Sequence, residues 1–358
     1  MTPVTTSRPA SDVRLSGYTT LRLGGPAARF VEATSAREVV DSVRAADSAG
    51  EPLLVLGGGS NVLVADKGFE GTVVHIASKG IGMDSTSAGQ VQLTAEAGES
   101  WDSVVEQTVK AGLGGLECLS GIPGLVGATP VQNVGAYGVE VAEVLVSVDL
   151  LDRASGEVRT LTADQLGLAY RTSVLKGTDR AVVLRVRFQL ADTGLSAPIR
   201  YAELANTLGV APGERVPVDR ARQSVLDLRR GKGMVLDPDD HDTWSAGSFF
   251  TNPVLPEPQL AEVLDRITRR VGPDVRIPQY PGGKLSAAWL IERAGFAKGY
   301  PGPGNRVALS HSHTLALTNR GDGTTEDLLS LAREVRDGVY AAFGVELAAE
   351  PVLVGCSL

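Results

Sequence analysis

The sequence predicts a chain of mixed α and β structure that divides into more than one domain. Its 358 residues exceed the roughly 100–200 residues of a usual domain. Helical and strand-like patterns alternate in the first and last thirds, whereas strand-like runs separated by turns dominate the middle. We therefore predict an α+β or α/β fold, with a mainly antiparallel sheet followed by a compact α/β domain.

Composition and charge exclude several classes of protein. Hydrophobic residues make up 43% and charged residues 21%, as in globular proteins, and no run approaches the ~18 apolar residues that span a bilayer. The segment 1–12 is polar and lacks the apolar core of a signal peptide. We expect it to be disordered and the protein to be cytoplasmic, without membrane contact. The net charge of -8 argues against nucleic-acid binding, which needs clustered lysine and arginine.

Cysteines and histidines give little indication of redox or metal chemistry. Cys118 and Cys356 form neither a disulfide framework nor a metal-binding spacing. The four histidines are scattered, and His311 and His313 would share a face only if their segment were a strand. Such pairs arise by chance more often than by metal binding, so we expect no metal site.

The N-terminal third begins with a capped helix and then a strand that ends in a glycine-rich turn. Ser35–Glu38 forms a capping box, apolar residues follow at helical spacing, and Gly50 ends the helix. A buried strand at 53–56 leads into Gly57–Asn61, after which 62–64 is strand-like. Rossmann and Walker glycine motifs need a helix at that point, so neither is supported. The turn is either an anion site for a pyrophosphate or a plain tight turn.

The most unusual segment is Gly121–Gly138, which follows a helix that we expect between Ser100 and Gly112. Its 18 residues include five glycines and two prolines and carry no charge. Such a backbone cannot form an ordinary helix or sheet, so its polar groups need other partners. As an exposed loop it would leave several aliphatic side chains in water. We therefore favour a buried cradle for a bound ligand.

The rest of the chain shows the same two kinds of pattern. β-branched runs with turns between them predict antiparallel strands at 144–151, 158–161 and 181–190. Apolar periodicity predicts helices at 218–230, 260–271 and 324–343, and the last strand-like run covers 345–355. Gly231-Lys-Gly233 interrupts the first of these helices, and we place a domain boundary there.

Several short motifs occur in a fixed order along the chain. They are Gly57–Asn61, Pro130–Asn133, Gly135–Gly138, Tyr170-Arg171, Gly247–Phe250 with Asn252, and Glu350. Each motif alone is weak evidence, but the ordered set, from about Leu15 to Gly355, resembles the UDP-N-acetylenolpyruvoylglucosamine reductases (MurB). Tyr201 resembles the tyrosine of a loop that folds over bound substrate in one subgroup of that family.

The resemblance implies a two-part FAD-binding region of the vanillyl-alcohol-oxidase (PCMH) type and a smaller α/β domain that holds the substrate. The implied FAD-binding subdomains are 13–75 and 76–231, and the implied substrate-binding domain is 232–344. Residues 345–358 would form a C-terminal strand that returns to the FAD region.

The same resemblance implies an enzyme, UDP-N-acetylmuramate dehydrogenase, which serves peptidoglycan precursor synthesis and thereby cell shape and division. NADPH reduces a non-covalently bound FAD, which passes hydride to C3 of the enolpyruvyl ether of UDP-N-acetylglucosamine, and C2 is then protonated. The chemistry needs a cation or acid near the substrate carboxylate and a proton donor at C2. We expect a monomer or weak oligomer.

Three residues match the positions that would meet these needs. Arg171 matches the cation, since a guanidinium holds a carboxylate through two parallel hydrogen bonds, although alone it would suggest a structural salt bridge. Ser248 matches the proton donor, which works only in a dry site, although alone it would be a turn serine. Glu350 matches the acid opposite Arg171, and burial would raise its pKa. Pro351 departs from the family pattern because it removes a strand donor, and Glu346 is the fallback.

The remaining matches are binding positions. The implied FAD-binding residues are Leu56, Gly57, Gly58, Gly59, Ser60, Asn61, Gly121, Ile122, Pro123, Gly124, Gly127, Ala128, Pro130, Gln132, Asn133, Gly135, Ala136 and Tyr137. The implied substrate-binding residues are Tyr170, Tyr201, Lys232, Asn252, Tyr280 and His313. Alone, Lys232 would be an exposed lysine, and the family varies at His313.

Two other functions remain open. An FAD-linked alcohol or sugar oxidase would share the fold, but many such relatives bind flavin covalently through an N-terminal histidine, and His75 lies outside any fitting motif. A flavin- or nucleotide-sugar-binding protein without catalysis would keep the cradle and lose the reacting groups, whereas Arg171, Ser248 and Glu350 are all present.

Overall fold

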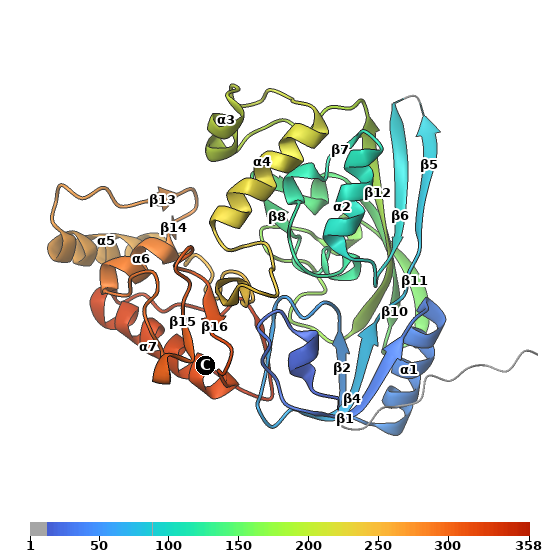
Figure 1. The fold of residues 1–358 in the computed structure, drawn as a ribbon, viewed down its shortest axis with the longest axis horizontal. Helices are drawn as coiled ribbons and strands as arrows, with labels where there is room; N and C mark the ends of the chain where they lie inside the picture. The colour runs from blue at the N-terminus through green and yellow to red at the C-terminus, as the bar shows by residue number, and fades with distance from the viewer. Residues whose placement is uncertain (1–12, 88) are drawn as a thin grey trace, which may run out of the picture. The chain divides into compact units, whose positions relative to one another are not determined.

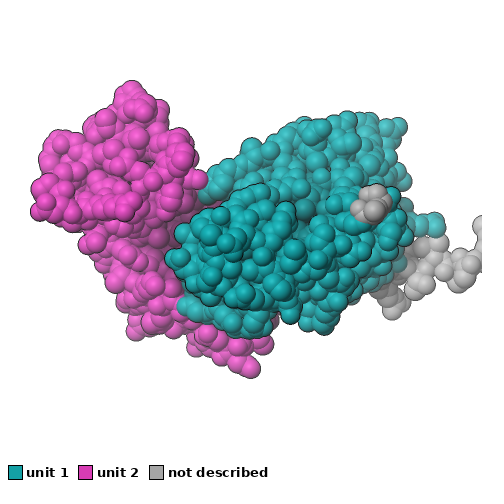
Figure 2. All heavy atoms as spheres, turned by 90° about the horizontal axis from the view of Figure 1, so that it is seen from above, with its two compact units in different colours: residues 1–13, 27–58, 69–235 teal, residues 14–26, 59–68, 236–358 magenta. Residues whose placement is uncertain are grey.

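The computed structural model describes residues 13–87 and 89–358, so the expected disorder of residues 1–12 lies outside it. Contacts between residues divide the chain into two compact units (Figure 1; Figure 2). Unit 1 comprises residues 1–13, 27–58 and 69–235, and unit 2 comprises residues 14–26, 59–68 and 236–358.

Unit 1 contains a small parallel sheet with the strand order β1-β4-β2, against which helix α1 packs (Figure 1). The bounds are Ala27–Ala33 for β1, Leu53–Leu56 for β2, Phe69–Ile76 for β4 and Ala36–Ala49 for α1. The Ser35 hydroxyl accepts from the Glu38 N–H, and Gly50 ends the helix at φ 65°, as predicted. The Glu38 carboxylate accepts from the N–H of Thr34 rather than of Ser35, so the capping box is displaced by one residue.

The second sheet of unit 1 is antiparallel and confirms the predicted central sheet (Figure 1). Its strand order is β11-β10-β12-β6-β5, and β7 also pairs with β12. The bounds are Ile81–Ser87 (β5), Gln90–Glu96 (β6), Leu113–Gly114 (β7), Leu145–Asp152 (β10), Glu157–Thr162 (β11) and Ala181–Asp192 (β12). Sequence analysis did not identify β5 and β6, although β6 alternates regularly between half-buried and buried residues.

Three helices, α2 (Trp101–Lys110), α3 (Ala202–Leu208) and α4 (Val218–Gly231), complete the core of unit 1. The buried Trp101 meets Phe188 of β12 edge-on, with ring centroids 5.8 Å apart, and donates its ring N–H to the Leu119 carbonyl. The Ser100 side chain, at the start of α2, makes no capping hydrogen bond. Its backbone instead pairs with Leu125, which joins the start of α2 to the glycine-rich segment.

Unit 2 is an α/β unit with a core of its own, as predicted. Its helices are α5 (Glu257–Val271), α6 (Ala287–Ala294) and α7 (Thr325–Phe343). Its strand pairs are β13 (Gln279–Tyr280) with β14 (Lys284–Leu285), β15 (Val307–Leu309) with β16 (Leu317–Asn319), and β17 (Val352–Val354) with β3 (Val62–Val64). The predicted strand at 345–355 is therefore too long, because apart from a bridge at Ala349 only three of its residues pair.

The remaining elements are two short strands and several 3-10 turns. The strands are β8 (Gly135–Ala136) and β9 (Val139–Glu140). The 3-10 turns are η1 (Leu15–Tyr18), η2 (Glu117–Leu119), η3 (Val126–Ala128), η4 (Val141–Glu143), η5 (Asp164–Leu166), η6 (His241–Thr243) and η7 (Pro303–Asn305). Within residues 13–87 and 89–358, no helix is both long and apolar enough to cross a membrane.

The contact units and the predicted domains divide the chain at somewhat different places. Unit 1 extends to Val235, a few residues beyond the predicted boundary at 231. The segments 14–26 and 59–68 belong to unit 2, because β17 pairs with β3 and the Gly25 N–H donates to the Ala65 carbonyl. The C-terminal strand thus returns to residues of the first predicted FAD-binding subdomain. The predicted domain ranges themselves stay predictions.

Asp327 at the start of α7 is expected to make stability depend on pH. Its carboxylate accepts from the Thr324 N–H in a complete capping box and from Arg306 at 2.6 and 2.9 Å. The hydrogen bonds from Arg306 outweigh burial and lower the pKa of Asp327 to about 2, from an ordinary value of 3.8. This carboxylate therefore stabilises the fold above about pH 4, and the stabilisation is lost as the pH falls towards 2.

Replacing Asp327 by Asn is expected to lower the free energy of unfolding by about 1 kcal/mol at pH 7. The difference from the unchanged protein should shrink as the pH falls from 4 to 2. Urea unfolding followed by circular dichroism measures both effects. Asp337→Asn on the exposed side of α7 serves as the control, and an equal pH dependence in the two variants would contradict the prediction.

Candidate active site

The two predicted glycine-rich stretches meet within unit 1. A Cβ added to Gly58 would lie 2.8 Å from the Gly124 Cα, whereas one added to Gly57 would meet only Leu125 Cδ1 at 3.8 Å. The first stretch directly follows β2, whose last residue is Leu56. The second stretch is irregular apart from η3 and β8, as expected from its glycines and prolines. Glycines, which leave the main chain uncovered, are therefore concentrated where the two stretches approach each other.

The start of the second stretch is fastened to α2 and α4. The Gly121 N–H donates to Asp102 at 2.6 Å, and Arg222 binds the same carboxylate at 2.7 and 3.0 Å. Burial opposes the ionisation of Asp102, but the hydrogen bonds from Arg222 and Gly121 outweigh it and lower its pKa. Further along, Gly127 packs against Ala97, where an added Cβ would lie only 2.5 Å from the alanine Cβ. Packing therefore requires a glycine at position 127, whether or not a ligand binds.

Asn133 does not point its side chain to a ligand. The residue is fully buried, its amide N–H₂ donates to Glu140 at 2.7 Å and to the Ala169 carbonyl at 3.1 Å, and its side-chain oxygen accepts from the Ala142 N–H. The protein itself therefore uses the side-chain amide of Asn133. Only the main chain of Asn133 stays a predicted cofactor contact.

Three predicted site residues have a left-handed backbone, which is unfavourable for residues other than glycine. They are Asn133 at φ 46°, Tyr137 at φ 51° and Arg171 at φ 52°. Such conformations cost of order 1–3 kcal/mol each and persist where the surroundings impose them, often at functional sites. Their concentration around the second glycine-rich stretch supports a functional role for it.

The side chain of Arg171 contacts the second glycine-rich stretch. Its guanidinium donates to the Gly135 carbonyl at 2.7 Å and to the Asn133 carbonyl at 3.4 Å, and it lies 5.3 Å from the centre of the Tyr170 ring. Lys176 donates to the Arg171 carbonyl at 2.7 Å, which holds the loop between β11 and β12 in place. These hydrogen bonds hold the guanidinium of Arg171 against the main chain of the second glycine-rich stretch.

Tyr137, Tyr201 and Lys232 form a cluster in unit 1. The two tyrosine rings meet edge-on, with centroids 5.5 Å apart, and the Lys232 ammonium lies 5.9 Å from the centre of the Tyr137 ring. Lys232 also forms an ion pair with Glu203, which sequence analysis missed. Burial raises the pKa of Tyr137 to about 12, so its phenol is a hydrogen-bond donor at neutral pH. A predicted cofactor residue and two predicted substrate residues are thus brought together.

Arg229 is a second residue that sequence analysis missed. Its Nε is buried and has no hydrogen-bond partner among the described residues, and it would lie 3.4 Å from a Cβ at Gly121. Burial lowers the pKa of Arg229, whereas Tyr137 and Asp102 act in the opposite direction. A signal was present in the sequence, because Arg229 continues the buried stripe of Ala221 and Val225 at four-residue spacing.

In unit 2, the turn that carries Ser248 is anchored by the two phenylalanines that follow it. Phe249 and Phe250 are each 1% exposed and pack edge-on. The Phe249 N–H donates to the Leu315 carbonyl at 2.7 Å, and its carbonyl accepts from the Glu350 N–H at 2.9 Å. The Ser248 hydroxyl lies 3.4 Å from Nε2 of His313. The structure thus brings together the segments of Ser248, His313 and Glu350.

The last segment of the chain differs from the expectation in its burial. Glu350 is half-buried rather than buried, and Val352, one of the aliphatic neighbours on which the expectation rested, is 59% exposed. The fallback residue Glu346 is exposed. The Glu350 N–H donates to the Phe249 carbonyl, and the Val352 N–H donates to the Asn61 carbonyl. Pro351, which has no N–H, lies between these two hydrogen-bonded residues.

The other predicted residues of unit 2 are less closely associated. The Asn252 side-chain oxygen accepts from the Ala287 N–H at the start of α6, while Tyr280 is 46% exposed in the β13–β14 hairpin. His311 and His313 lie in a loop rather than in a strand, so they do not share a sheet face. Among residues 13–87 and 89–358, no group of three His, Cys, Asp or Glu could hold a metal ion.

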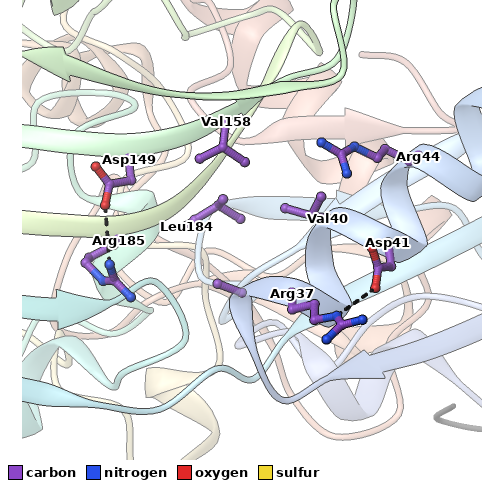
Figure 3. A pocket seen from close by; sticks show the side chains of 9 residues that line it. Arg37, Val40, Asp41, Arg44, Asp149, Val158, Leu184 and Arg185 are labelled. Carbon is purple, nitrogen blue, oxygen red and sulfur yellow. Dashed lines mark hydrogen bonds and ion pairs between the residues drawn. The ribbon is translucent and has the colours of Figure 1, made fainter. Parts of the chain in front are cut away.

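A hollow of about 400 Å³ lies elsewhere in unit 1, between α1 and the antiparallel sheet (Figure 3). Of its charged residues, Arg37 pairs with Asp41 at 3.6 Å and Arg185 with Asp149 at 3.5 Å, while Arg44 donates to the Gly156 carbonyl at 3.0 Å. None of the predicted site residues lines it. Its charged groups therefore have partners within the protein, and it does not form part of the candidate site.

Two family models match the chain. Residues 27–162 match an FAD binding domain, and residues 237–354 match the C-terminal domain of UDP-N-acetylenolpyruvoylglucosamine reductase. The first match covers the parallel sheet and β5 to β11, and the second covers most of unit 2. The predicted combination of a PCMH-type FAD-binding region and a smaller α/β domain is thereby confirmed.

Individual relatives match over nearly the whole chain. The UDP-N-acetylenolpyruvoylglucosamine reductase of Saccharopolyspora erythraea is 69% identical over 354 residues, which cover 98% of this chain and 97% of that protein. The corresponding protein of Thermobifida fusca is 54% identical, with coverage of 98% and 99%. A crystal structure of the MurB reductase from Thermus caldophilus matches with a TM-score of 0.64 and 25% identity, over 97% of this chain and 99% of that one. The chain therefore belongs to the UDP-N-acetylenolpyruvoylglucosamine reductase family of FAD-dependent oxidoreductases.

Proposed function

We propose that this protein uses NADPH to reduce UDP-N-acetylglucosamine enolpyruvate to UDP-N-acetylmuramate, a cytoplasmic step of peptidoglycan precursor synthesis. The activity named for the relatives supports the substrate. The observation that carries the proposal is the hydrogen bond of Arg171 to the Gly135 carbonyl, because it holds a cation against the glycine-rich cradle. The protein would act as a monomer or weak oligomer on this small nucleotide sugar, without a nucleic-acid or membrane partner.

The residues of unit 1 fit a bound FAD. The close approach of Gly58 and Gly124 leaves main-chain N–H groups uncovered by side chains, which suits a pyrophosphate. The buried Nε of Arg229 is a donor in need of an acceptor, which an electron-rich part of the flavin would provide. The predicted FAD-binding residues, with the main chain of Asn133 in place of its side chain, would hold the cofactor. Arg229 would join them.

Replacing Gly58 by Ala is expected to reduce flavin binding at least about 10-fold, which corresponds to ~1.4 kcal/mol. The added Cβ would lie 2.8 Å from the Gly124 Cα, so the two glycine stretches would have to separate. Gly57→Ala is the matched control, since its Cβ would meet one side-chain atom at an ordinary 3.8 Å. Titration of the apoprotein with FAD, followed by flavin fluorescence, measures the effect. Equal affinities in the two variants would remove this contact from the flavin site.

When bound, FAD supplies the redox chemistry, since it takes a hydride from NADPH and transfers one to C3 of the enolpyruvyl group. The substrate then carries negative charge at C2, which spreads into its carboxylate. The protein must stabilise this charge and give C2 a proton. We assign these tasks to Arg171, Glu350 and Ser248.

Arg171 would hold the substrate carboxylate through two parallel hydrogen bonds and would stabilise the charge that develops on it. Its hydrogen bonds to the Gly135 and Asn133 carbonyls would hold the guanidinium in position for this task. Glu350, in a protonated or proton-sharing form, would contact the same carboxylate. Its half-buried position and the backbone bond to Phe249 support a place beside the turn of Ser248.

Ser248 would give its proton to C2. A serine hydroxyl is a weak acid, so it needs a fixed position and little competing water. The buried side chains of Phe249 and Phe250 fix the turn on one side. The loop of His313 lies on the other side, where the Leu315 carbonyl accepts from the Phe249 N–H.

Lys232 and Tyr201 would bind the substrate diphosphate. Lys232 now pairs with Glu203, and it would exchange this carboxylate for phosphate oxygens when substrate binds. Tyr201 is 46% exposed and directly precedes α3, and Glu203 lies in the first turn of that helix. The start of α3 can therefore present both residues to a ligand. This arrangement supports placing the protein in the subgroup with a substrate-covering tyrosine. Tyr170, Asn252 and Tyr280 stay proposed substrate contacts.

The proposed function is tested by the colour of the purified protein. We expect it to be yellow, to lose the colour when NADPH is added without oxygen, and to regain it with the enolpyruvyl nucleotide sugar. If air restores the colour rapidly and the nucleotide sugar never does, the protein is an oxidase. If NADPH and the nucleotide sugar both bind without any colour change, it is a binding protein without catalysis.

A further inference from the structure

His313 faces the residue to which the proton-donating role falls. Its Nε2 lies 3.4 Å from the Ser248 hydroxyl. Hydrogen bonds of this kind are often long before substrate binds and shorten in the reacting complex. The two loops that carry these residues are joined, because the Phe249 N–H, next to Ser248, donates to the Leu315 carbonyl, two residues after His313.

A second set of hydrogen bonds holds the main chain of His313 in place. Its main-chain N–H donates to the Ser310 hydroxyl at 3.0 Å, and Ser310, which is fully buried, donates to Asp242 at 2.7 Å. Asp242 also accepts from the His311 N–H at 3.0 Å and from Arg320 at 2.9 Å. The loop that carries His313 is therefore anchored on the half-buried carboxylate of Asp242.

The chemistry requires a group that returns a proton to the serine. A serine that gives its proton to C2 becomes an alkoxide, which is far too basic to persist at neutral pH and must be reprotonated before the next turnover. Among the ionisable side chains, histidine is the one that exchanges protons most readily near neutral pH. The described contacts place an imidazole nitrogen at the serine oxygen.

We propose that His313 reprotonates Ser248 during catalysis, as a positioning residue that acts through the serine. The step balances: the imidazolium Nε2–H transfers its proton to the Ser248 Oγ as the serine proton moves to C2, and the neutral imidazole then takes a proton from water. His313 is half-buried, so water can reach it. This inference rests on the proposed role of Ser248, and it replaces the predicted substrate contact of His313.

The charged groups that hydrogen-bond to this loop have partners other than Ser248. Burial opposes the ionisation of Asp242, but the hydrogen bonds from His311, Ser310 and Arg320 lower its pKa to about 2, so it stays charged at neutral pH. Arg320 and the His311 ring are both bound to Asp242. Glu292 accepts from the Thr314 hydroxyl. Of these groups, His313 is the one that contacts the serine hydroxyl.

The test separates the two half-reactions by stopped-flow absorbance of the flavin. In His313→Gln, NADPH should reduce the flavin at a rate within about twofold of that of the unchanged enzyme. Such a rate would also show that the variant is folded and carries its flavin. Its reoxidation by the enolpyruvyl nucleotide sugar should fall about 10²-fold, the lower end of the range for general acid–base catalysis. His311→Gln, two residues away and bound to Asp242 through its ring, is the matched control and should match the unchanged enzyme in both steps.

Three further measurements distinguish proton supply from a structural role. In the unchanged enzyme, reoxidation should slow as the pH rises and the imidazolium loses its proton, whereas in His313→Gln it should be slow at every pH. Imidazole added to His313→Ala should restore at least part of the rate, increasingly so at lower pH. The NMR titration of the His313 ring should shift when Ser248 is replaced by Ala.

The outcomes are separable from those of the proposed function. If Ser248→Ala slows reoxidation but His313→Gln keeps the unchanged rate and pH profile, the inference on His313 is overturned and the role of Ser248 stands. If Ser248→Ala itself reoxidises at the unchanged rate, both roles fail. If His313→Gln slows reduction by NADPH as much as reoxidation, the residue is structural and the inference is also overturned.

Discussion

Replacing Ser248 by Ala is expected to leave reduction of the flavin by NADPH nearly unchanged and to slow its reoxidation by the enolpyruvyl nucleotide sugar about 10³-fold. The expected loss is the middle of the range for general acid catalysis by one positioned side chain. The turn should keep its shape in the variant, because the buried Phe249 and Phe250 and the backbone bond to Leu315 hold it without the hydroxyl. Anaerobic stopped-flow absorbance at the flavin band measures each half-reaction separately.

The control for Ser248 tests chemistry at the same position. Ser248→Cys keeps a proton on a side chain of similar size, so part of the reoxidation rate should return. If both variants lose the two half-reactions equally, the residue shapes the site rather than donating a proton. If alanine has no effect on reoxidation, the proton at C2 comes from elsewhere and Glu350 becomes the next candidate.

Replacing Arg171 by Met is expected to slow reoxidation by the enolpyruvyl substrate about 10²–10³-fold, the usual loss when one stabiliser of developing negative charge is removed. Reduction by NADPH should change much less, since that step has no enolpyruvyl carboxylate to stabilise. Arg171→Lys should recover only part of the rate, because an ammonium cannot make the two parallel bonds of a guanidinium. The same stopped-flow assay, with substrate varied, measures binding and rate separately.

A neighbouring arginine provides the control for Arg171. Arg180 is exposed in the same loop and donates to the Val174 carbonyl, away from the glycine cradle. Arg180→Met should therefore keep both half-reactions. Equal losses in the two arginine variants would mean that loop stability, rather than charge at the cradle, accounts for the effect. A loss of flavin from Arg171→Met would show instead that the residue supports the cofactor through Gly135.

Much of the fold could be predicted because the relevant signals are local. The N-terminal capping of α1 and α7, the glycines at the ends of both helices and the β-branched runs of β10, β11 and β12 depend on residues close together in the sequence. β1, β4, β5 and β6 were not predicted: the second half of β5 is polar and lacks apolar alternation, whereas β6 does alternate. The end of the chain was predicted as one long strand, but Pro351 lacks an N–H and pairing resumes only at Val352.

The candidate site divides in the same way. The glycine-rich stretches and the motif residues Arg171, Ser248 and Glu350 could be found in the sequence, because they lie within short recognisable patterns. The orientation of Asn133 could not, because its amide is taken by Glu140 and Ala169, and the second of these lies 36 positions away. Arg229 carried a weak signal, a charge within an apolar stripe, but its unpartnered Nε depends on what packs around it.

The sequence by itself determined the family, the cofactor-binding domain, several of the helices and strands and the identity of the candidate reacting groups. These properties depend on residue type and short spacing. Only the tertiary structure decided that Gly58 meets Gly124, that Lys232 pairs with Glu203 beside Tyr137, and that His313 lies at the hydroxyl of Ser248. Each of these contacts joins residues that are far apart in the chain, and burial and hydrogen bonding between such residues arise only when the packed elements bring them together.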